Sequence, residues 1–452
     1  MVVQKFGGTS VADPDAIARL IQIVRTARSR DGRGPAVVVS AMSGVTDALL
    51  AIAAAAGGGR VDDALSRLEQ LRERHLAVAR ALAPKEAKGA LGEQIGAQFD
   101  GLAALARALG VLREVSPRTL DVVAAAGELI SSRIITAALT GAGIPSEWVD
   151  ARRAIITNGD HTRAVPLAAE TEAALRSTVL AAIDAGRVPV LGGFVGSTID
   201  GHTTTLGRGG SDYSGAIVGA GIGASEIQIW TDVDGMLTAD PRVISTTRLV
   251  PQLSFAEAAE LAYFGAKVLH PSTILPAVER NIPVRILNSK NPEGAGTMIT
   301  AEPPPASTPL AALACKRDVT VVDITSSRML MAYGFLRRVF EVFERYTTAV
   351  DVVTTSEVTV SVTVDDRRHL EAIVEALSEF SQVSVDHEMA LLCAVGDRLR
   401  NEPAIAARAV GVLEEVPLRM ISQAASRRNI TVIIRQADLQ HAMNRLHEEF
   451  FS

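Results

Sequence analysis

The chain has 452 residues, of which 48% are hydrophobic and 21% are charged. This balance is ordinary for a globular protein and excludes a disordered or fibrous chain, and the length suggests about three compact units. The formal net charge is −6, from 45 basic and 51 acidic residues, so the chain has no overall basic footprint for nucleic acid.

The two cysteines, Cys315 and Cys393, lie far apart and lack metal-ligand spacing, so neither a disulfide framework nor a zinc site is predicted. No apolar run approaches the roughly 18 residues that cross a bilayer. The N-terminal Val2–Gln4 shows no basic and apolar leader. We therefore expect a cytoplasmic protein with neither a membrane nor a nucleic-acid partner.

Residues 1–300 alternate short apolar runs with helical patterns. Asp13 and Pro14 mark one helix start, and apolar residues at helical spacing follow them. Strands that are apolar on both faces belong inside a sheet covered by helices, which predicts an α/β sandwich. The predicted strands are Val2–Phe6, Ala36–Ser40, Ser146–Asp150, Val188–Phe194, Ile227–Trp230 and Val284–Leu287.

Residues 301–308, Ala-Glu-Pro-Pro-Pro-Ala-Ser-Thr, break both periodicities and are typical of a stiff linker. The rest, 309–452, predicts two small α+β units. The first, about 316–388, has the order βαββαβ, whereas the second, about 389–452, stops at βαββα. Because the apolar segment 309–315 can supply the missing strand, we predict two interlocked units.

Lys5-Phe6-Gly7-Gly8-Thr9-Ser10 stands between the first predicted strand and the first helix. Paired glycines let backbone N–H groups approach an anion, and Lys5 can direct a charge at a phosphate. The Walker pattern is absent, because the chain contains no Gly-Lys pair. The segment predicts a phosphate site of another kind.

A second glycine-rich segment, Leu206–Ser214, has the same logic. Gly209 and Gly210 can cradle an anion, Arg208 can grip a carboxylate, and Asp212 can orient a group or a metal. The hydroxyl-rich segment 40–46 follows the second strand, where open α/β sheets bind ligands.

Glu128 lies in a helical run of small and apolar residues, so its carboxylate needs a cationic partner. A substrate ammonium or Arg133 could fill that role. Residues 230–242 form a polar turn at the end of a predicted strand, where a nucleotide base and ribose could lie, with Arg242 near the phosphates. Lys267 offers a second cation that could be directed at a phosphate. Gly219–Ala224 precedes a strand, the reverse of the dinucleotide fingerprint, and is interpreted as a helix end.

Four segments resemble, in sequence and in order along the chain, those of aspartate kinases, which are members of the amino-acid kinase superfamily. They are Lys5–Ser10, Gly207–Ser214, Trp230–Arg242 and Gly265–Pro271. The resemblance runs along essentially the whole chain. It implies an open α/β sandwich kinase domain followed by two interlocked ACT domains. It also implies transfer of the ATP γ-phosphate to the β-carboxylate of L-aspartate, the first step of lysine, threonine and methionine (diaminopimelate) biosynthesis.

By this resemblance the catalytic residues are Lys5, Asp212 and Lys267. ATP would contact Lys5, Gly7, Gly8, Ser10, Thr231, Asp232, Leu237, Arg242 and Lys267, and L-aspartate would contact Ser40, Thr46, Glu128, Arg208 and Ser211. Leu237 stands where the family commonly has tyrosine. No metal site made of side chains is predicted, and Mg²⁺ would enter with ATP.

The segment 329–336 leads from a strand into a helix, where backbone amides after Gly334 can take a carboxylate and Asp351 can take an ammonium. Its amino-acid sequence, together with that of residues 352–357, is similar to the lysine-sensitive branch of the aspartate kinases. This implies a lysine site at Met329, Gly334, Phe335, Leu336, Val350, Asp351 and Ser356. Ala349 replaces a serine of that branch, and threonine, alone or with lysine, stays an alternative. ACT domains usually pair across subunits, which implies a homodimer or homotetramer.

Two other functions stay open at this point. One is a related kinase that acts on another carboxylate such as glutamate, because the sequence does not distinguish two substrates whose side chains differ by one methylene group. The other is an amino-acid-sensing regulator with an inactive kinase domain, against which Lys5, Arg208, Asp212 and Lys267 argue. A fused homoserine dehydrogenase is not expected.

Overall fold

The computed structural model describes every residue except 208, 266–270, 305–307, 327–332, 398, 400–401 and 424–425, and also leaves out the side chains of 31, 271 and 272. The chain divides into two compact units, each described here by itself. The first comprises Met1–Met236, Pro251–Phe255 and Val268–Pro303, and the second comprises Leu237–Val250, Ala256–Lys267 and Pro304–Ser452. Two segments from the first 300 residues thus belong to the second unit.

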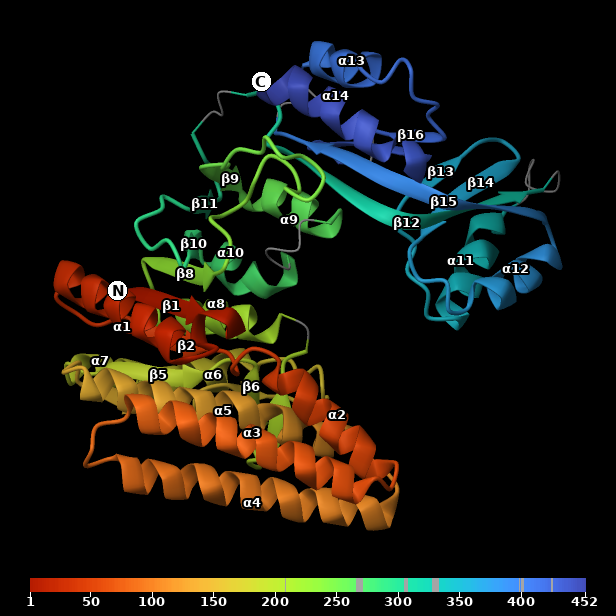
Figure 1. Cartoon of the computed structure of the whole chain (residues 1–452). Coiled ribbons are helices and arrows are strands. Elements are labelled where there is room, and N and C mark those ends of the chain that lie inside the picture. The colour runs from red at the N-terminus through yellow and green to blue at the C-terminus, as the bar shows by residue number, and fades with distance from the viewer. Residues whose placement is uncertain are drawn as a thin grey trace. The chain divides into compact units, whose positions relative to one another are not determined.

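The first unit is built on an eight-stranded sheet in the order β3-β5-β2-β1-β8-β10-β11-β9 (Figure 1). The strands from β3 to β10 are parallel, so their carboxyl ends meet at one edge, where open α/β sheets bind ligands. The strands are β1 (Val2–Phe6), β2 (Ala36–Val39), β3 (Ser146–Trp148), β5 (Val188–Gly192), β8 (Glu226–Thr231), β9 (Gln252–Ser254), β10 (Val284–Asn288) and β11 (Thr297–Thr300). They confirm the sheet of the predicted α/β sandwich.

Five helices share an apolar core with one face of this sheet. They are α1 (Pro14–Asp31), α2 (Val45–Gly57), α3 (Val61–Leu82), α4 (Lys88–Leu112) and α5 (Pro117–Gly141). Helix α1 begins as the sequence predicts, because the Asp13 side chain accepts a hydrogen bond from Ala16 N at 2.8 Å and Pro14 takes the first helical position. Phe6 contributes to this core and stacks on Trp230 with ring centroids 6.1 Å apart.

Helix α8 (Gly210–Ile222) lies against the side of β1 that carries Lys5, because a Cβ at Gly215 would come within 3.2 Å of Lys5 Cβ. The shorter helices of this unit are η1 (Gly8–Val11), η2 (Ala151–Arg153), α6 (Ala168–Leu175), η3 (Arg176–Leu180), α7 (Ala181–Asp184), η4 (Pro271–Ile274) and α10 (Leu275–Glu279). A small sheet of β4 (Ile156–Thr157), β6 (Val195–Thr198) and β7 (Thr203–Thr205) completes the unit.

Helices α4 and α5 have the length and composition of a membrane span, contrary to the expectation that no such run exists. Composition alone is weak evidence, because a core helix of a water-soluble protein passes the same test. In α5 the most apolar stretch is 78% buried, and its side chains pack in the core with those of α1 to α4. The corresponding stretch of α4 is 33% buried. The apolar composition of α5 therefore reflects its burial in the core shared with α1 to α4.

The second unit carries one antiparallel sheet in the order β13-β14-β12-β15-β17-β16. Its strands are β12 (Ala312–Thr325), β13 (Val353–Thr355), β14 (Thr359–Val364), β15 (Gln382–Val395), β16 (Met420–Ser422) and β17 (Asn429–Arg435). Its helices are α9 (Phe255–Tyr263), α11 (Phe335–Arg345), α12 (Leu370–Ser378), α13 (Pro403–Gly411), η6 (Gln436–Asp438) and α14 (Leu439–Phe451).

The two long strands β12 and β15 join two α+β units, which the resemblance leads us to expect as ACT units. Residues 312–316 of β12 pair with 391–395 of β15, and 321–325 pair with 382–386. Each pairing belongs to a different core, one with α13 and α14 and the other with α11 and α12. The predicted boundaries between the two units, near residues 316 and 389, fall inside β12 and β15. Each strand runs from one unit into the other, and the polar residues between the apolar runs form an irregularity in the β12–β15 ladder, where Asp318 has φ of +58° and Glu388 has φ of +54°.

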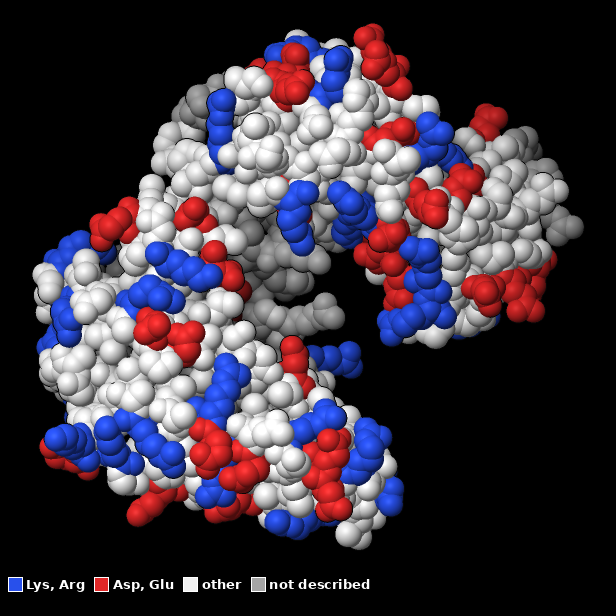
Figure 2. All heavy atoms as spheres, in the orientation of Figure 1, with Lys and Arg blue, Asp and Glu red and all other residues white. Residues whose placement is uncertain are grey.

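The predicted interlocking is therefore confirmed: 312–316 completes the sheet of the second ACT unit. On the face seen in Figure 2, acidic and basic side chains are interspersed over both units.

Candidate active site

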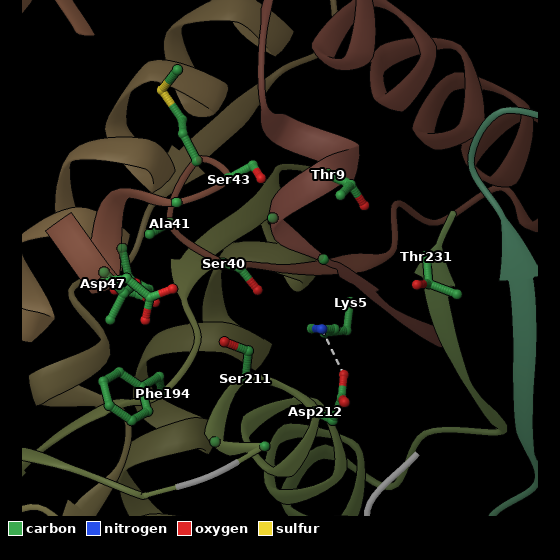
Figure 3. Close-up of a pocket in the computed structure, with 18 of the residues that line it drawn as sticks. Lys5, Thr9, Ser40, Ala41, Ser43, Asp47, Phe194, Ser211, Asp212 and Thr231 are labelled. Carbon is green, nitrogen blue, oxygen red and sulfur yellow. Dashed lines mark ion pairs between the residues drawn. The ribbon is translucent and has the colours of Figure 1, made fainter. Parts of the chain in front are cut away.

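A cavity of about 520 Å³ opens in the first unit where the parallel strands β1, β2, β5 and β8 end. Figure 3 shows Lys5, Ser40, Ser211 and Asp212 around one space, with Phe194 and Asp47 farther along the wall. The predicted residues that line the cavity are Lys5, Gly7, Gly8, Ser40, Thr46, Glu128, Ser211, Asp212, Thr231 and Asp232. The fold thus brings together residues more than 200 positions apart in the sequence.

Lys5 and Asp212 form an ion pair at the floor of the cavity. Lys5 Nζ lies 2.6 Å from Asp212 Oδ1, and the two side chains are 9% and 18% exposed. Lys5 comes from β1 and Asp212 from the first turn of α8. Because both side chains are largely buried, the pair is screened by solvent much less than a surface pair. The Lys5 ammonium is therefore held in place beside the first glycine-rich turn.

The first glycine-rich turn, at Gly7 and Gly8, packs closely against the loop that follows β2. A Cβ at Gly8 would lie 3.1 Å from the carbonyl oxygen of Ala41, so a larger residue would press on the neighbouring loop. Gly7 N–H donates to the carbonyl of Trp230 at the end of β8. The turn is therefore fixed against both neighbouring strand ends, with Lys5 beside it.

Arg74 of α3 bridges the loop that follows β2 and the end of η1. Its guanidinium donates to the carbonyl oxygen of Ser43 at 3.0 Å and to that of Ala12 at 3.2 Å. Because one planar group spans both carbonyls, the 40–46 loop and the end of η1 keep a fixed separation.

Glu128 of α5 is 3% exposed and reaches the opposite wall of the cavity. Burial raises the pKa of Glu128 to about 8, against the opposing effects of hydrogen bonds from the Ala41 backbone and the Thr46 side chain and of the positive charge on Lys5. Among the described residues, its Oε2 has no hydrogen-bond partner. The site therefore holds a carboxyl oxygen that a cationic group could meet.

Arg133 is not that partner. Its guanidinium lies 3.5 Å from the ring centroid of Trp148 and donates to Gln94 at 3.2 Å. Residues 128 and 133 are five positions apart on one helix, so they point to different faces. Arg133 is therefore not the cationic partner of Glu128, which was one of the two possibilities that the sequence left open.

The second glycine-rich segment forms another wall of the cavity. Gly209 has φ of +69° and precedes α8, and Gly193 lies so close that a Cβ there would come within 2.9 Å of Ser211 Cα. This conformation and this approach both require glycine. Arg208, between Gly207 and Gly209, lies outside the described residues.

Some predicted nucleotide residues lie elsewhere. Ser10 is 1% exposed and turns away from the cavity, with its Oγ 2.8 Å from Ser289 Oγ and 3.3 Å from the Trp230 carbonyl. Leu237 and Arg242 belong to the second unit, where Arg242 pairs with Asp240 at 2.6 Å. Lys267 lies outside the described residues.

Sequence reasoning missed Phe194 and Asp47, which also line the cavity. Phe194 follows Gly192 and Gly193 at the end of β5 and has φ of +66°. A glycine pair directly after a buried strand was the available signal, since it marks close backbone approach at the edge where ligands bind. Asp47 lies in the first turn of α2 and carries no comparable signal.

The predicted effector residues lie in the first ACT unit, except Met329, which is outside the described residues. Gly334, with φ of +85°, precedes α11, and the ring of Phe335 meets that of Phe380 edge-on. Leu336 is 42% exposed, Val350 is half-buried, and Ser356 lies in the exposed turn before Thr359. Asp351 pairs with Lys316 at 3.0 Å.

Comparison with known proteins agrees with this architecture. Residues 1–288 match the sequence model of the amino acid kinase family, and residues 392–450 match that of an ACT domain. The chain is 36% identical over 461 residues to lysine-sensitive aspartokinase 3 of Escherichia coli K12, covering 100% of this chain and 99% of that protein. It is 37% identical to the chloroplastic aspartokinase 3 of Arabidopsis thaliana, covering 99% and 81%.

The crystal structure of E. coli aspartokinase III in complex with lysine and aspartate superposes with a TM-score of 0.85 at 36% identity. Its complex with aspartate and ADP gives 0.84 at 35% identity, and both comparisons cover the whole of each chain. The fold is that of a phosphotransferase with a carboxyl acceptor. The chain belongs to the amino acid kinase family and, within it, to the aspartokinases.

Proposed function

We propose that this chain transfers the γ-phosphoryl group of ATP to the β-carboxylate of L-aspartate, giving 4-phospho-L-aspartate and ADP. This is the first committed step toward lysine, threonine and methionine. The observation that carries the proposal is the cavity itself, which gathers the Lys5–Asp212 pair, two glycine-rich walls and Glu128 in one space. One oxygen of the aspartate side chain forms a bond to the γ-phosphorus as the bond from that phosphorus to the bridging oxygen breaks.

The reaction needs positioning more than proton transfer. The acceptor carboxylate has a reference pKa of about 3.9, so it is already ionised at neutral pH and needs no general base. Two anions must be aligned and the developing charge neutralised. Lys5, with backbone N–H groups of the first glycine-rich turn, supports that role because its ammonium stands beside the turn.

Mg²⁺ is proposed to accompany ATP. Asp212 and Asp232 both line the cavity, and carboxylate oxygens are the ligands that this hard cation prefers. No group of three or more potential metal-ligating side chains occurs among the described residues. When bound, Mg²⁺ would neutralise phosphate charge.

Glu128 is proposed to bind the aspartate ammonium. Glu128 lines the cavity and its Oε2 has no hydrogen-bond partner among the described residues, so a cation bound beside it would favour the ionised carboxylate. Ser40, Thr46 and Ser211 offer hydroxyl groups from three other segments of the wall. The assignment of Arg208 to the α-carboxylate and of Lys267 to the nucleotide stays a prediction.

Lysine is proposed as the feedback inhibitor, with Asp351 as the residue that recognises an ammonium group in the ACT unit. E. coli aspartokinase III, a full-length relative, is known in complex with lysine. Inhibition requires that the effector bind the inactive arrangement better than the active one. Threonine, a homodimeric or homotetrameric assembly through the ACT domains, and a cytoplasmic location stay predictions.

The test is ATP-dependent acyl-phosphate formation, trapped by hydroxylamine, with L-aspartate and L-glutamate in parallel and with lysine and threonine titrated into each. We expect product with aspartate alone and suppression by lysine. Product with glutamate would point to another amino-acid kinase. A folded protein that binds lysine yet yields no product would overturn the kinase proposal and leave a sensor.

A further inference from the structure

Asp121 is a fully buried carboxylate of α5 that the proposed chemistry does not use. Its Oδ1 accepts hydrogen bonds from Thr162 N at 3.0 Å and from Thr205 Oγ1 at 2.5 Å. Its Oδ2 lies 2.5 Å from His161 Nδ1. A buried carboxylate without partners is strongly unfavourable, so these three partners account for its place in the core.

The partners come from two separate segments. His161 and Thr162 lie in the turn between β4 and α6, and Thr205 is the last residue of β7. Thr162 has φ of +71°, a left-handed conformation that is unfavourable for a residue with a side chain. The hydrogen bond from its N–H to Asp121 helps to hold the turn in this conformation.

Both segments support one wall of the cavity. Gly207 follows Thr205 by two residues, has φ of +76°, and would place a Cβ 3.4 Å from the carbonyl oxygen of Thr162. Gly207, Gly209 and Ser211 line the cavity. Asp121 therefore bonds both to the strand that leads into this wall and to the turn on which Gly207 rests.

Glu128 lies on the same helix, seven residues after Asp121. Seven residues are about two helical turns, so the two carboxyl groups share one face of α5 at an axial separation of about 10 Å. One faces the cavity directly and the other holds the wall that contains Gly207. Helix α5 thus sets the distance between two walls of the same site.

We infer that Asp121 is a positioning residue for the acceptor: it fixes the Gly207–Ser211 wall relative to Glu128. The inference rests on the proposed function, with L-aspartate as the acceptor bound between these walls. The first glycine-rich turn and Lys5 are supplied by β1 and its loop, which make no hydrogen bond to Asp121 among the described residues. Loss of the Asp121 contacts should therefore weaken aspartate binding selectively.

The sharpest test uses two neighbouring threonines of β7. Thr205→Val removes the hydroxyl that donates to Asp121, whereas Thr204→Val removes an equally buried hydroxyl that meets Thr157 Oγ1 at 2.7 Å. Each replacement keeps the shape of the side chain and loses one buried hydrogen bond; because the bond to the Asp121 carboxylate is the stronger of the two, Thr205→Val is expected to lose more stability than Thr204→Val. Steady-state KM values for aspartate and ATP and the melting temperature would be measured for both.

We expect Thr205→Val to raise the KM for aspartate about fivefold to tenfold and to leave the KM for ATP within about twofold. Thr204→Val should leave both KM values within about twofold. Thr205→Ser should restore the aspartate KM, because its hydroxyl can still donate. An unchanged aspartate KM in Thr205→Val, or equal changes in both KM values, would overturn the inference.

Asp121→Asn provides a second measurement. The amide oxygen can still accept from Thr162 and Thr205, so this variant should keep most aspartate affinity, whereas Asp121→Ala should lose it. Equal aspartate KM values in these two folded variants would contradict the positioning role. Wild-type turnover with aspartate is measured first, and its absence would overturn the proposed function. Normal wild-type turnover, together with variants whose KM for aspartate is unchanged, would overturn this inference alone.

Discussion

Lys316 Nζ lies 3.0 Å from Asp351 Oδ2, and the Asp351 side chain is only 7% exposed. The carboxylate assigned to the ammonium of an effector therefore already has an ammonium beside it. Lys316 also lies 3.5 Å from Asp365 Oδ2 and 5.0 Å from the ring centroid of Tyr263. Burial, together with Asp351, raises the pKa of Tyr263 to about 12, so the phenol keeps its proton.

We predict that Lys316→Met makes the enzyme more sensitive to lysine, because the effector ammonium no longer competes with an internal one. The lysine concentration for half-inhibition should fall several-fold, with a charge-assisted contact of about 1.5–3 kcal/mol setting the upper limit. Inhibition curves at fixed substrate would show it. Lys290→Met, at an exposed lysine of the first unit, is the control. A higher half-inhibition concentration in Lys316→Met would contradict the competition.

Aspartate binding should release a proton from Glu128. With a pKa of about 8 the free side chain is about 90% protonated at pH 7, and a bound ammonium would hold it ionised. Calorimetric titration in buffers of different ionisation enthalpy should therefore show release of about 0.9 proton per site. Glu128→Gln should abolish the release. Buffer-independent binding enthalpy in the wild-type enzyme would contradict the assignment.

The same shift predicts how stability depends on pH without ligand. The folded pKa of Glu128, about 8, lies above its ordinary value of 4.5, so between these values the folded state binds more protons than the unfolded state. The contribution of this group to stability is therefore full below pH of about 4.5 and declines as the pH rises toward 8. Denaturant unfolding at pH 5 and pH 8 should show a smaller decline in Glu128→Gln than in the wild-type protein.

Lys5→Ala should lower turnover by roughly 10²–10³, about 3–4 kcal/mol, by analogy with other groups that stabilise developing negative charge. The loss also leaves Asp212 without its ion-pair partner in a largely buried place. Initial rates at saturating substrates and circular dichroism would separate catalysis from folding. Turnover within about threefold of wild type, with the fold intact, would refute the role.

Ser10 and Thr9 form a contrasting pair. The Ser10 hydroxyl points inward to Ser289 and the Trp230 carbonyl, whereas Thr9 is exposed and lines the cavity. Ser10→Ala should lower the free energy of unfolding by about 1 kcal/mol and leave the KM for ATP nearly unchanged. Thr9→Ala should do the reverse. A raised KM for ATP in Ser10→Ala at unchanged stability would return Ser10 to the nucleotide site.

The sequence was sufficient for the parts of the site that are local. Lys5 beside paired glycines, and a carboxylate such as Glu128 in an apolar helix, are chemical signals that span a few residues. Because the carboxyl ends of parallel strands meet at one edge, motifs that follow buried strands could be expected to converge there. The cavity contains ten of the predicted residues for that reason.

Side-chain direction and long-range pairing could not be read in this way. Ser10 belongs to the same motif as Lys5 yet turns inward, because Ser289, 279 residues away, offers its hydroxyl. The membership of 237–250 in the second unit also depends on distant packing, where Ala239, Val243 and Ile244 join the core of the second ACT unit.

By itself, then, the sequence determined the fold class and the interlocked ACT pair and predicted the phosphate and ammonium sites, since periodicity and motif chemistry act over short stretches of chain. Tertiary structure alone decided that Asp121 ties β7 to α5, and that Lys316 meets Asp351. These pairs join residues 84 and 35 positions apart. Their meeting is set by strand register and helix packing, which no local pattern encodes.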